Sequence, residues 1–253
     1  MRSPVEPSTL VYILFATLAG GVLSVLAAGL LSLTVLARWA PRLVSFAVGV
    51  LLAAAFLNLL PEAAAQLPAN QVGATVLAGL FLFFALEKAT LWRHDHAQTA
   101  PVVIGAAARP VGPMIVFGDG LHNFVDGVLI AAAFMQDTAL GIATATAVIA
   151  HEIPQEVGDF MVLLAAGYSR ARALVLNALS GAAMLVGGVA GYLLLQQVQG
   201  AIPWLLALSA ASFIYIAVAD LVPALQEHRQ PMDFAMQFVL LVGGVAMVTF
   251  GSA

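Results

Sequence analysis

The sequence contains no cysteine and few charged residues. Without thiols the chain cannot form disulfides, thiolate metal sites or cysteine nucleophiles. Charged residues make up 9% of the chain and hydrophobic residues 62%, whereas soluble domains carry about 25% charged residues. The formal net charge of −4 provides no basic surface for nucleic acid. The composition therefore indicates neither a soluble domain nor a nucleic-acid-binding protein, but a chain whose apolar surface faces lipid.

Long apolar runs bounded by proline, glycine or charge predict the membrane-spanning helices. Each span needs about 20 apolar residues, so the chain accommodates eight spans with short connections. We expect an all-α polytopic membrane protein, a single transmembrane domain over residues 1–253, with its longest connection at about 93–112. The predicted spans cover roughly residues 9–36, 42–66, 71–92, 113–136, 139–165, 174–197, 203–226 and 232–252.

The basic residues set the predicted orientation. All Lys and Arg residues except Arg2 fall in or beside the first, third, fifth and seventh connections. Positively charged connections stay in the cytoplasm. Both termini are therefore predicted to lie outside, and the connection at about 93–112 is predicted to be cytoplasmic.

A short internal repeat joins the second and seventh predicted spans. Residues 58–62 read NLLPE and residues 220–224 read DLVPA, with a polar residue three positions before a proline in each. With spans 4 and 5 as a central pair, spans 1–3 and 6–8 would be inverted halves in a 3+2+3 arrangement, as in many transporters. Asn58 and Asp220 are interpreted as pathway residues or helix-bridging groups. Glu62 is interpreted as a solvated acid near the outer surface or as a ligand at the mouth of the pathway.

The fourth and fifth predicted spans carry most of the polar side chains that need an explanation. A charge at the centre of a bilayer costs about 2.5–3.5 kcal/mol, so several together have to face one another, water or a cation. In these two spans they are Asp119, His122, Asn123, Asp126, His151, Glu152, Gln155, Glu156 and Asp159.

The spacing of these residues predicts a metal site between two helices. Asp119, His122 and Asp126 stand at i, i+3 and i+7, which is one helical face. In the fifth span the pairs at i and i+4 are His151 with Gln155 and Glu152 with Glu156. Imidazole with carboxylate suits Zn²⁺ and its first-row neighbours, whereas all-oxygen sites suit Mg²⁺ or Ca²⁺. Without thiolates the ion can be held and also released.

At these residues the sequence resembles the ZIP (Zrt/Irt-like) family of metal transporters. Residues 122–127 read HNFVDG, similar to the family's HNFxDG motif, and residues 151–160 read HEIPQEVGDF, similar to the HExPHExGD signature of one large subgroup. The resemblance covers essentially the whole chain. It implies transport of Zn²⁺, or of Fe²⁺, Mn²⁺ or Cd²⁺, into the cytoplasm through a two-metal site between spans 4 and 5. It also implies a homodimer in the lipid bilayer.

The polar residues and the resemblance together predict the residues of the site, and His122, Asn123, Asp126, His151, Glu152 and Glu156 are those that fall on the family's motifs. Two positions depart from the family's pattern: Gln155 replaces a second histidine, and Met184 stands where some members have glutamate. His151 is a histidine where iron-carrying members of the family often have glutamate, and this favours zinc. The predicted metal ligands are His122, Asn123, Asp126, His151, Glu152, Gln155 and Glu156, and the predicted pathway residues are Asp119, Asn58, Glu62, Asp159, Asp220, His94 and His96.

Two other functions use the same residues differently. An intramembrane zinc metallohydrolase would use His151-Glu152 as the start of an HExxH motif, although Gln155 replaces the second histidine and Pro154 interrupts the helix. A metal-binding membrane sensor would bind the ion without conducting it. We expect a transporter rather than an enzyme, placed in the plasma membrane and, given the short connections, in a prokaryotic inner membrane.

Overall fold

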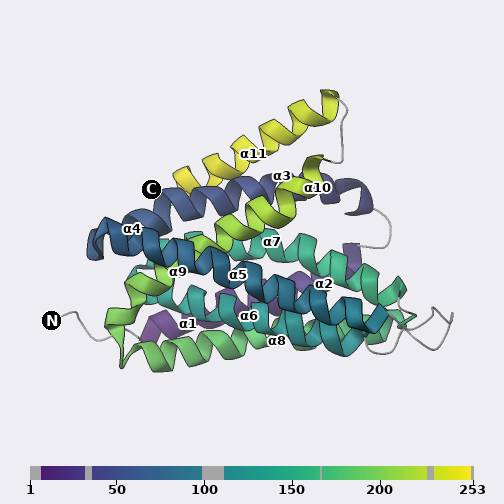
Figure 1. Cartoon of the computed structure of the whole chain (residues 1–253), viewed down its shortest axis with the longest axis horizontal. Helices are drawn as coiled ribbons and strands as arrows, with labels where there is room; N and C mark the ends of the chain where they lie inside the picture. The colour runs from purple at the N-terminus through teal and green to yellow at the C-terminus, as the bar shows by residue number, and fades with distance from the viewer. Residues whose placement is uncertain (1–6, 32–35, 99–110, 166, 227–230, 252–253) are drawn as a thin grey trace.

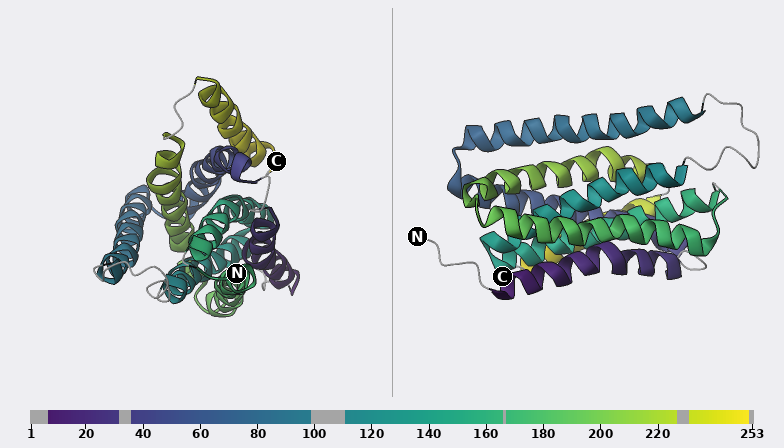
Figure 2. Two further views of the ribbon diagram at one scale, coloured as in Figure 1. Left: turned by 90° about the vertical axis from the view of Figure 1, so that its right-hand side faces the viewer. Right: turned by 90° about the horizontal axis from the view of Figure 1, so that it is seen from below.

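The chain folds into helical rods that lie along one axis of the molecule (Figure 1). The computed structural model describes residues 7–31, 36–98, 111–165, 167–226 and 231–251. In these residues all regular structure is helical, and helices that follow one another end to end form eight rods. The start of α1 and the end of α11 lie at the same end of the molecule (Figures 1 and 2).

Three rods contain a π-helical turn, and five are single α-helices. The first rod is α1 (Pro7–Leu18), η1 (Ala19–Leu23) and α2 (Ser24–Leu31); the second is α3 (Leu36–Ala53), η2 (Ala54–Leu59) and α4 (Leu60–Gln66). The seventh follows the short η3 (Gln199–Ala201) and consists of α9 (Ile202–Tyr215), η4 (Ile216–Leu221) and α10 (Val222–Gln226). The single helices are α5 (Ala69–Gln98), α6 (Val111–Gln136), α7 (Thr138–Ala165), α8 (Arg170–Leu195) and α11 (Pro231–Gly251).

The prediction of eight helical segments is confirmed for the described residues, with two corrections to their bounds. α3 begins at Leu36, so the first predicted span ended too late and the second began too late. α5 continues to Gln98, so His94 and His96 belong to a helix and not to the predicted connection. Residues 87–98 contain no glycine or proline and are rich in helix-forming residues, so hydropathy falls well before the helix ends.

The chain is a polytopic membrane protein. Among the described residues, five helical stretches are long and apolar enough to cross a membrane, and a shorter apolar helix covers Phe234–Phe250. Many of the exposed side chains are large and apolar, for example Phe15, Phe81 and Phe250, as a lipid-facing surface requires. The five stretches are Ser8–Ala27, Arg42–Gln66, Ala69–Leu86, Arg170–Leu195 and Gln199–Ala219.

The rods pack as two groups that meet at α6 and α7. In one group α6 packs along α8, and the first rod packs against α8 and α7. In the other α11 packs along α3, and α5 packs along α9. The groups meet where α3 contacts α7 and where α9 contacts α6. The two helices that carry the ionisable residues therefore contact both groups.

Two glycines bring α6 and α8 into close contact. A Cβ atom at Gly127 would collide with the backbone carbonyl of Met184, and a Cβ atom at Gly187 would collide with that of Phe124. Small residues permit such backbone approach between membrane helices. Met184 is fully buried, with its sulfur atom against Gly20. α8 therefore contributes a thioether, and not a carboxylate, to this packing.

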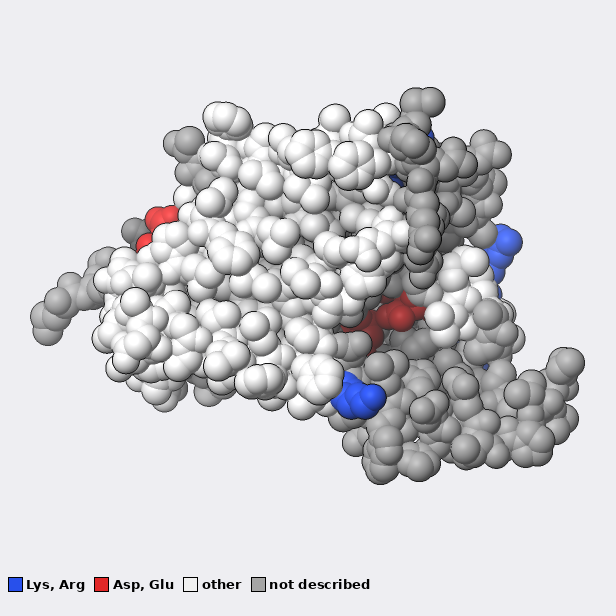
Figure 3. Space-filling model, turned by 45° about the horizontal axis from the view of Figure 1, so that its top comes forward, with Lys and Arg blue, Asp and Glu red and all other residues white. Residues whose placement is uncertain are grey.

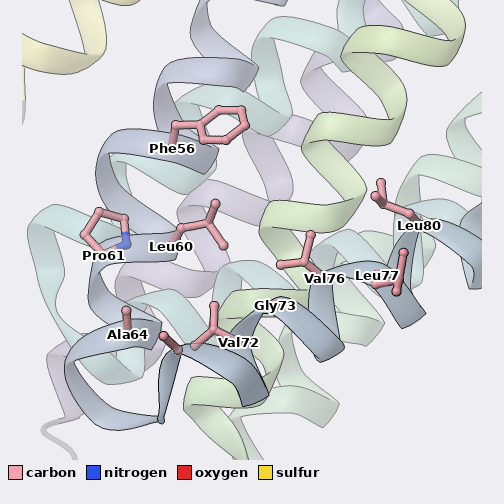
Figure 4. A pocket seen from close by; sticks show the side chains of 10 residues that line it. Phe56, Leu60, Pro61, Ala64, Val72, Gly73, Val76, Leu77 and Leu80 are labelled. Atoms are coloured by element: carbon pink, nitrogen blue, oxygen red, sulfur yellow. The ribbon is translucent and has the colours of Figure 1, made fainter.

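An apolar groove of about 580 Å³ lies between the second rod and α5 (Figure 4). Its lining includes Phe56, Leu60, Val72, Val76 and Leu77 and contains no ionisable side chain. Because it presents no metal ligand, the groove is not part of the candidate site.

Candidate metal site

A single-residue connection places the polar faces of α6 and α7 side by side. α6 ends at Gln136 and α7 begins at Thr138. Between them Asp137 caps α7, because its Oδ1 accepts hydrogen bonds from the backbone N–H groups of Ala139 (2.8 Å) and Leu140 (3.1 Å). Asp126 precedes this turn by 11 residues and His151 follows it by 14. At a rise of about 1.5 Å per residue, these two side chains reach similar depths in the bundle.

Four side chains meet between the two helices: His122, Asp126, His151 and Glu152. One ligand atom from each lies within 4.8 Å of the others. The two imidazole Nε2 atoms are 3.3 Å apart. Asp126 Oδ2 lies 3.6 Å from His122 Nε2 and 3.2 Å from His151 Nε2, and Glu152 Oε1 lies 3.7 Å from each. We call these four residues the imidazole–carboxylate cluster.

The imidazole–carboxylate cluster is closed to solvent except at His122. Asp126 and Glu152 are fully buried and His151 is 1% exposed, whereas the His122 side chain is 22% exposed. Among the described residues, no carboxylate oxygen of Asp126 or Glu152 accepts an aligned hydrogen bond. Buried carboxylates without hydrogen bonds are costly. The cluster thus has acceptor capacity that the described protein groups leave unused.

The backbone fixes the orientation of the His151 ring. His151 Nδ1 lies 3.1 Å from the carbonyl oxygen of Ala147. A carbonyl can only accept, so Nδ1 carries the hydrogen and a neutral ring has its lone pair on Nε2. This lone pair faces the carboxylate of Asp126. A cation between them, either a proton or a metal ion, would remove the repulsion.

A second group of polar side chains lies one turn nearer the end of the bundle where α6 begins. Asp119 Oδ1 accepts hydrogen bonds from Asn123 Nδ2 (3.1 Å) and Gln155 Nε2 (3.0 Å). Asn123 Nδ2 also lies 3.2 Å from the backbone carbonyl of Asp119. We call these three residues the amide cluster. The predicted shared face of Asp119, His122 and Asp126 is thus divided between two levels of the same helix.

Glu156 and Asp159 place two further carboxyl groups on α7, one and four positions after Gln155. Glu156 is fully buried, and neither carboxylate oxygen has a hydrogen-bond partner among the described residues. Its backbone carbonyl accepts a hydrogen bond from Asn177 Nδ2 of α8 (3.2 Å). Together with Asp119, Asp126 and Glu152, the two acids bring the number of carboxyl groups on this part of α6 and α7 to five. Acidic side chains also form the floor of a hollow in an otherwise mostly uncharged face (Figure 3).

Of the remaining predicted pathway residues, Asn58 and Glu62 lie outside both clusters. Asn58 belongs to η2 and is half-buried. Glu62 belongs to α4, and its Oε1 accepts hydrogen bonds from Gln66 (2.9 Å) and Gln136 (2.6 Å), so it connects the second rod to the end of α6. The backbone of Asp220 belongs to η4, and those of His94 and His96 to α5; the side chains of these three residues lie outside the described part of the structure.

Three groups that contact predicted site residues were not themselves predicted from the sequence: the Ala147 carbonyl, Asn177 and Gln136. Asn177 is a buried amide in a mostly apolar helix, and this isolated polar residue was visible in the sequence. The other two contacts follow from helix packing and chain geometry, and no residue pattern indicates them.

The fold and these contacts define a helical, polytopic membrane protein with imidazole and carboxylate groups buried between two central helices. Comparison with known proteins gives the family. The family profile described as ZIP Zinc transporter matches residues 93–251. The chain belongs to this family, whose members are zinc transporters and not enzymes.

The chain is similar to several animal zinc transporters. It is 34% identical to zinc transporter ZIP13 of Pongo abelii, in an alignment that covers 83% of this chain and 66% of the relative. It is 32% identical to human ZIP13, with 83% of this chain and 70% of the relative covered. It is 40% identical to the zinc transporter foi of Drosophila melanogaster, over 53% of this chain and 19% of the relative. The chain thus spans about two thirds of the ZIP13 relatives and about a fifth of foi.

Proposed function

We propose that this chain carries Zn²⁺ across the membrane into the cytoplasm, and that the ion binds in the imidazole–carboxylate cluster. The spacing of the four ligand atoms carries the proposal. Zinc bonds to nitrogen and oxygen of about 2.0–2.1 Å in tetrahedral geometry require ligand atoms about 3.3–3.4 Å apart. The five separations given above run from 3.2 to 3.7 Å. An ion at their centre would need only small side-chain shifts.

The charge of the surroundings also supports a dication. Asp126 and Glu152 each lie 3.2–3.7 Å from both imidazoles, and three further carboxyl groups, those of Asp119, Glu156 and Asp159, are carried by the same two helices. In a low-dielectric interior, repulsion among those that are ionised is only weakly screened. A divalent cation would bind the unpartnered oxygens and offset the repulsion.

A second ion is part of the proposal. Asn123, Gln155 and Glu156 are the remaining predicted ligands, and the oxygens of Asn123 and Glu156 have no hydrogen-bond partner among the described residues. Neutral amide oxygens bind zinc more weakly than imidazole does. We assign this second sub-site to release of the ion toward the cytoplasm.

The proposed membrane arrangement is eight spans in a 3+2+3 inverted repeat with both termini outside. Its support comes from the second and seventh rods. Each has a six-residue π-helical segment that ends two residues before a proline, Pro61 in one rod and Pro223 in the other. The packing is reciprocal, since η2 contacts α9 and η4 contacts α3. The distribution of Lys and Arg supports the orientation. The inward direction of transport is what the resemblance to the family implies.

The metal preference, the oligomeric state, the domain extent and the membrane of residence stay predictions. Fe²⁺, Mn²⁺ and Cd²⁺ are alternative cargo ions that the same donor set accepts. A homodimer, a single domain over the whole chain and a prokaryotic inner membrane stay predictions. A membrane sensor would bind zinc in the same cluster without flux, so a flux measurement separates the two functions.

The test is zinc uptake into proteoliposomes that contain the purified full chain and a zinc-sensitive dye. We expect His122→Ala and His151→Ala to abolish uptake. Thr146→Ala is a matched control on α7, because this side chain donates a hydrogen bond to the Ile142 carbonyl within its own helix (2.8 Å) and belongs to neither cluster. Uptake equal to wild type in both histidine variants would contradict the proposed site. Binding without uptake by the wild type would favour the sensor.

A further inference from the structure

We infer that Asp119 is a positioning residue that turns the carbonyl oxygens of Asn123 and Gln155 toward the second ion. The inference rests on the proposed function and specifies how the second sub-site is built. Asp119 and Asn123 lie on α6, and Gln155 lies on α7. One carboxylate therefore controls ligand groups from both helices.

The argument starts from what a carboxylate can do in a hydrogen bond. An ionised carboxylate accepts hydrogen bonds and donates none, whereas a side-chain amide has a donor end and an acceptor end. Because Asp119 Oδ1 contacts both amides, at 3.1 and 3.0 Å, each amide has to present its NH₂ group to it. The carbonyl oxygen of each amide then points away from Asp119. This assignment of the amide nitrogen and oxygen follows from the chemistry of the carboxylate partner alone.

Asn123 is restrained twice. Its Nδ2 lies near two acceptors, Asp119 Oδ1 and the Asp119 backbone carbonyl, and neither can donate to the amide oxygen. Asn123 is fully buried, and its Oδ1 has no hydrogen-bond partner among the described residues. A buried amide oxygen held in this way is a preformed acceptor, and a cation satisfies it.

The same logic accounts for the departure at Gln155. A histidine at this position could donate one ring N–H to Asp119 and present its other nitrogen to the ion, as in carboxylate–histidine–zinc arrangements. Glutamine uses its NH₂ group and carbonyl oxygen in the same two roles. Asp119 would thus orient a glutamine or a histidine at position 155. The residue type at this position determines whether the ion is coordinated by oxygen or by nitrogen.

The experiment measures binding of two Co²⁺ ions, as a spectroscopic substitute for zinc, to the purified full chain in detergent. Absorption between cobalt d orbitals distinguishes a nitrogen-containing site from an all-oxygen site, and calorimetry gives the two affinities. We expect Asp119→Ala to lower the affinity for the second ion by about 10–100-fold, as loss of a ligand-orienting group does. Asp119→Asn, whose amide oxygen can still accept, should restore most of this loss. The affinity for the first ion should fall less than the affinity for the second, because Asp119 contributes only its charge there. An unchanged cobalt spectrum of the first ion also shows that the variants fold.

A double-mutant cycle separates positioning from direct coordination. In the background Asn123→Ala with Gln155→Ala, Asp119→Ala should cause no further loss, because the groups it orients are absent. Asp137→Asn, an acid-to-amide change at the α7 cap, is the matched control and should leave both affinities unchanged. Full additivity would overturn the inference, since Asp119 would then bind the ion itself.

The two proposals fail in different ways. Wild-type protein that binds one ion but not a second would overturn the role of Asp119 and leave the imidazole–carboxylate cluster intact. Wild-type protein that binds no ion would overturn the proposed function. Equal loss in Asp119→Asn and Asp119→Ala would mean that charge, and not orientation, is what Asp119 contributes.

Discussion

The imidazole–carboxylate cluster and the amide cluster lie one helical turn apart and hold buried polar groups in different ways. In the first, the Asp126 and Glu152 oxygens accept no aligned hydrogen bond among the described residues. In the second, Asp119 accepts hydrogen bonds from both amides. The first cluster therefore leaves all its carboxylate oxygens to a cation, whereas in the second Asp119 Oδ1 is satisfied by the protein and Asp119 Oδ2 and Asn123 Oδ1 have no partner among the described residues. Under the proposed function, capture of the ion belongs to the first cluster and its release to the second.

The largest effect is expected when an imidazole is removed from the first cluster. His151→Ala deletes a nitrogen ligand whose ring is already oriented by the Ala147 carbonyl. We expect a loss in first-ion affinity of more than about 100-fold, above the range for loss of a group that only orients a ligand. Isothermal titration with Zn²⁺ measures it. An affinity within 10-fold of wild type would show that the ion binds elsewhere.

The second prediction concerns a variant in which the amide cluster becomes chemically more similar to the imidazole–carboxylate cluster. Gln155→His replaces an amide oxygen by an imidazole nitrogen beside Asp119. We expect second-ion affinity to rise by about 10-fold, which is about 1.4 kcal/mol, and uptake into proteoliposomes to slow because the ion leaves less readily. Gln155→Glu is the comparison variant, because it adds charge without nitrogen. Faster uptake in Gln155→His would contradict the assignment of this cluster to release.

The third prediction concerns the support that α8 gives to this part of α7. Asn177→Ala removes the hydrogen bond to the Glu156 carbonyl. We expect the free energy of unfolding to fall by about 1 kcal/mol, with first-ion affinity nearly unchanged. Thermal unfolding in detergent, with and without Zn²⁺, measures both. A loss of first-ion affinity as large as that of His151→Ala would indicate that the two regions are coupled.

The smallest effect is expected at the far end of α6. Glu62→Ala removes the acceptor for Gln66 and Gln136 but no contact of either cluster. We expect both equilibrium affinities to stay within about 3-fold of wild type. A larger change, measured in the same titration, would mean that Glu62 belongs to a metal site.

The sequence predicted the existence of the helices better than their ends. Apolar runs indicated eight segments because each rod needs a long apolar surface. The end of α5 was missed because residues 93–98 are polar and still favour a helix. The π-helical segments before Pro61 and Pro223 were not predicted, because only their hydrogen bonds distinguish them from α-helix.

The sequence predicted those features of the candidate site that depend on residue spacing within a single helix. The i, i+3 and i, i+4 spacings brought out His122, Asp126, His151 and Glu152, and the structure brings these four together. Which side chains share a level between α6 and α7 was not predictable, since it depends on the length of the turn at Asp137 and on helix packing. For this reason the link between Asp119 and Gln155 appeared only in three dimensions.

A structure of the zinc-loaded protein, with anomalous diffraction recorded on both sides of the zinc absorption edge, tests the central claim most directly. The account predicts an anomalous peak between α6 and α7, about 2.0–2.2 Å from the ligand atoms of the imidazole–carboxylate cluster. A map with no peak there, in which these four side chains instead bond other protein groups, would contradict it.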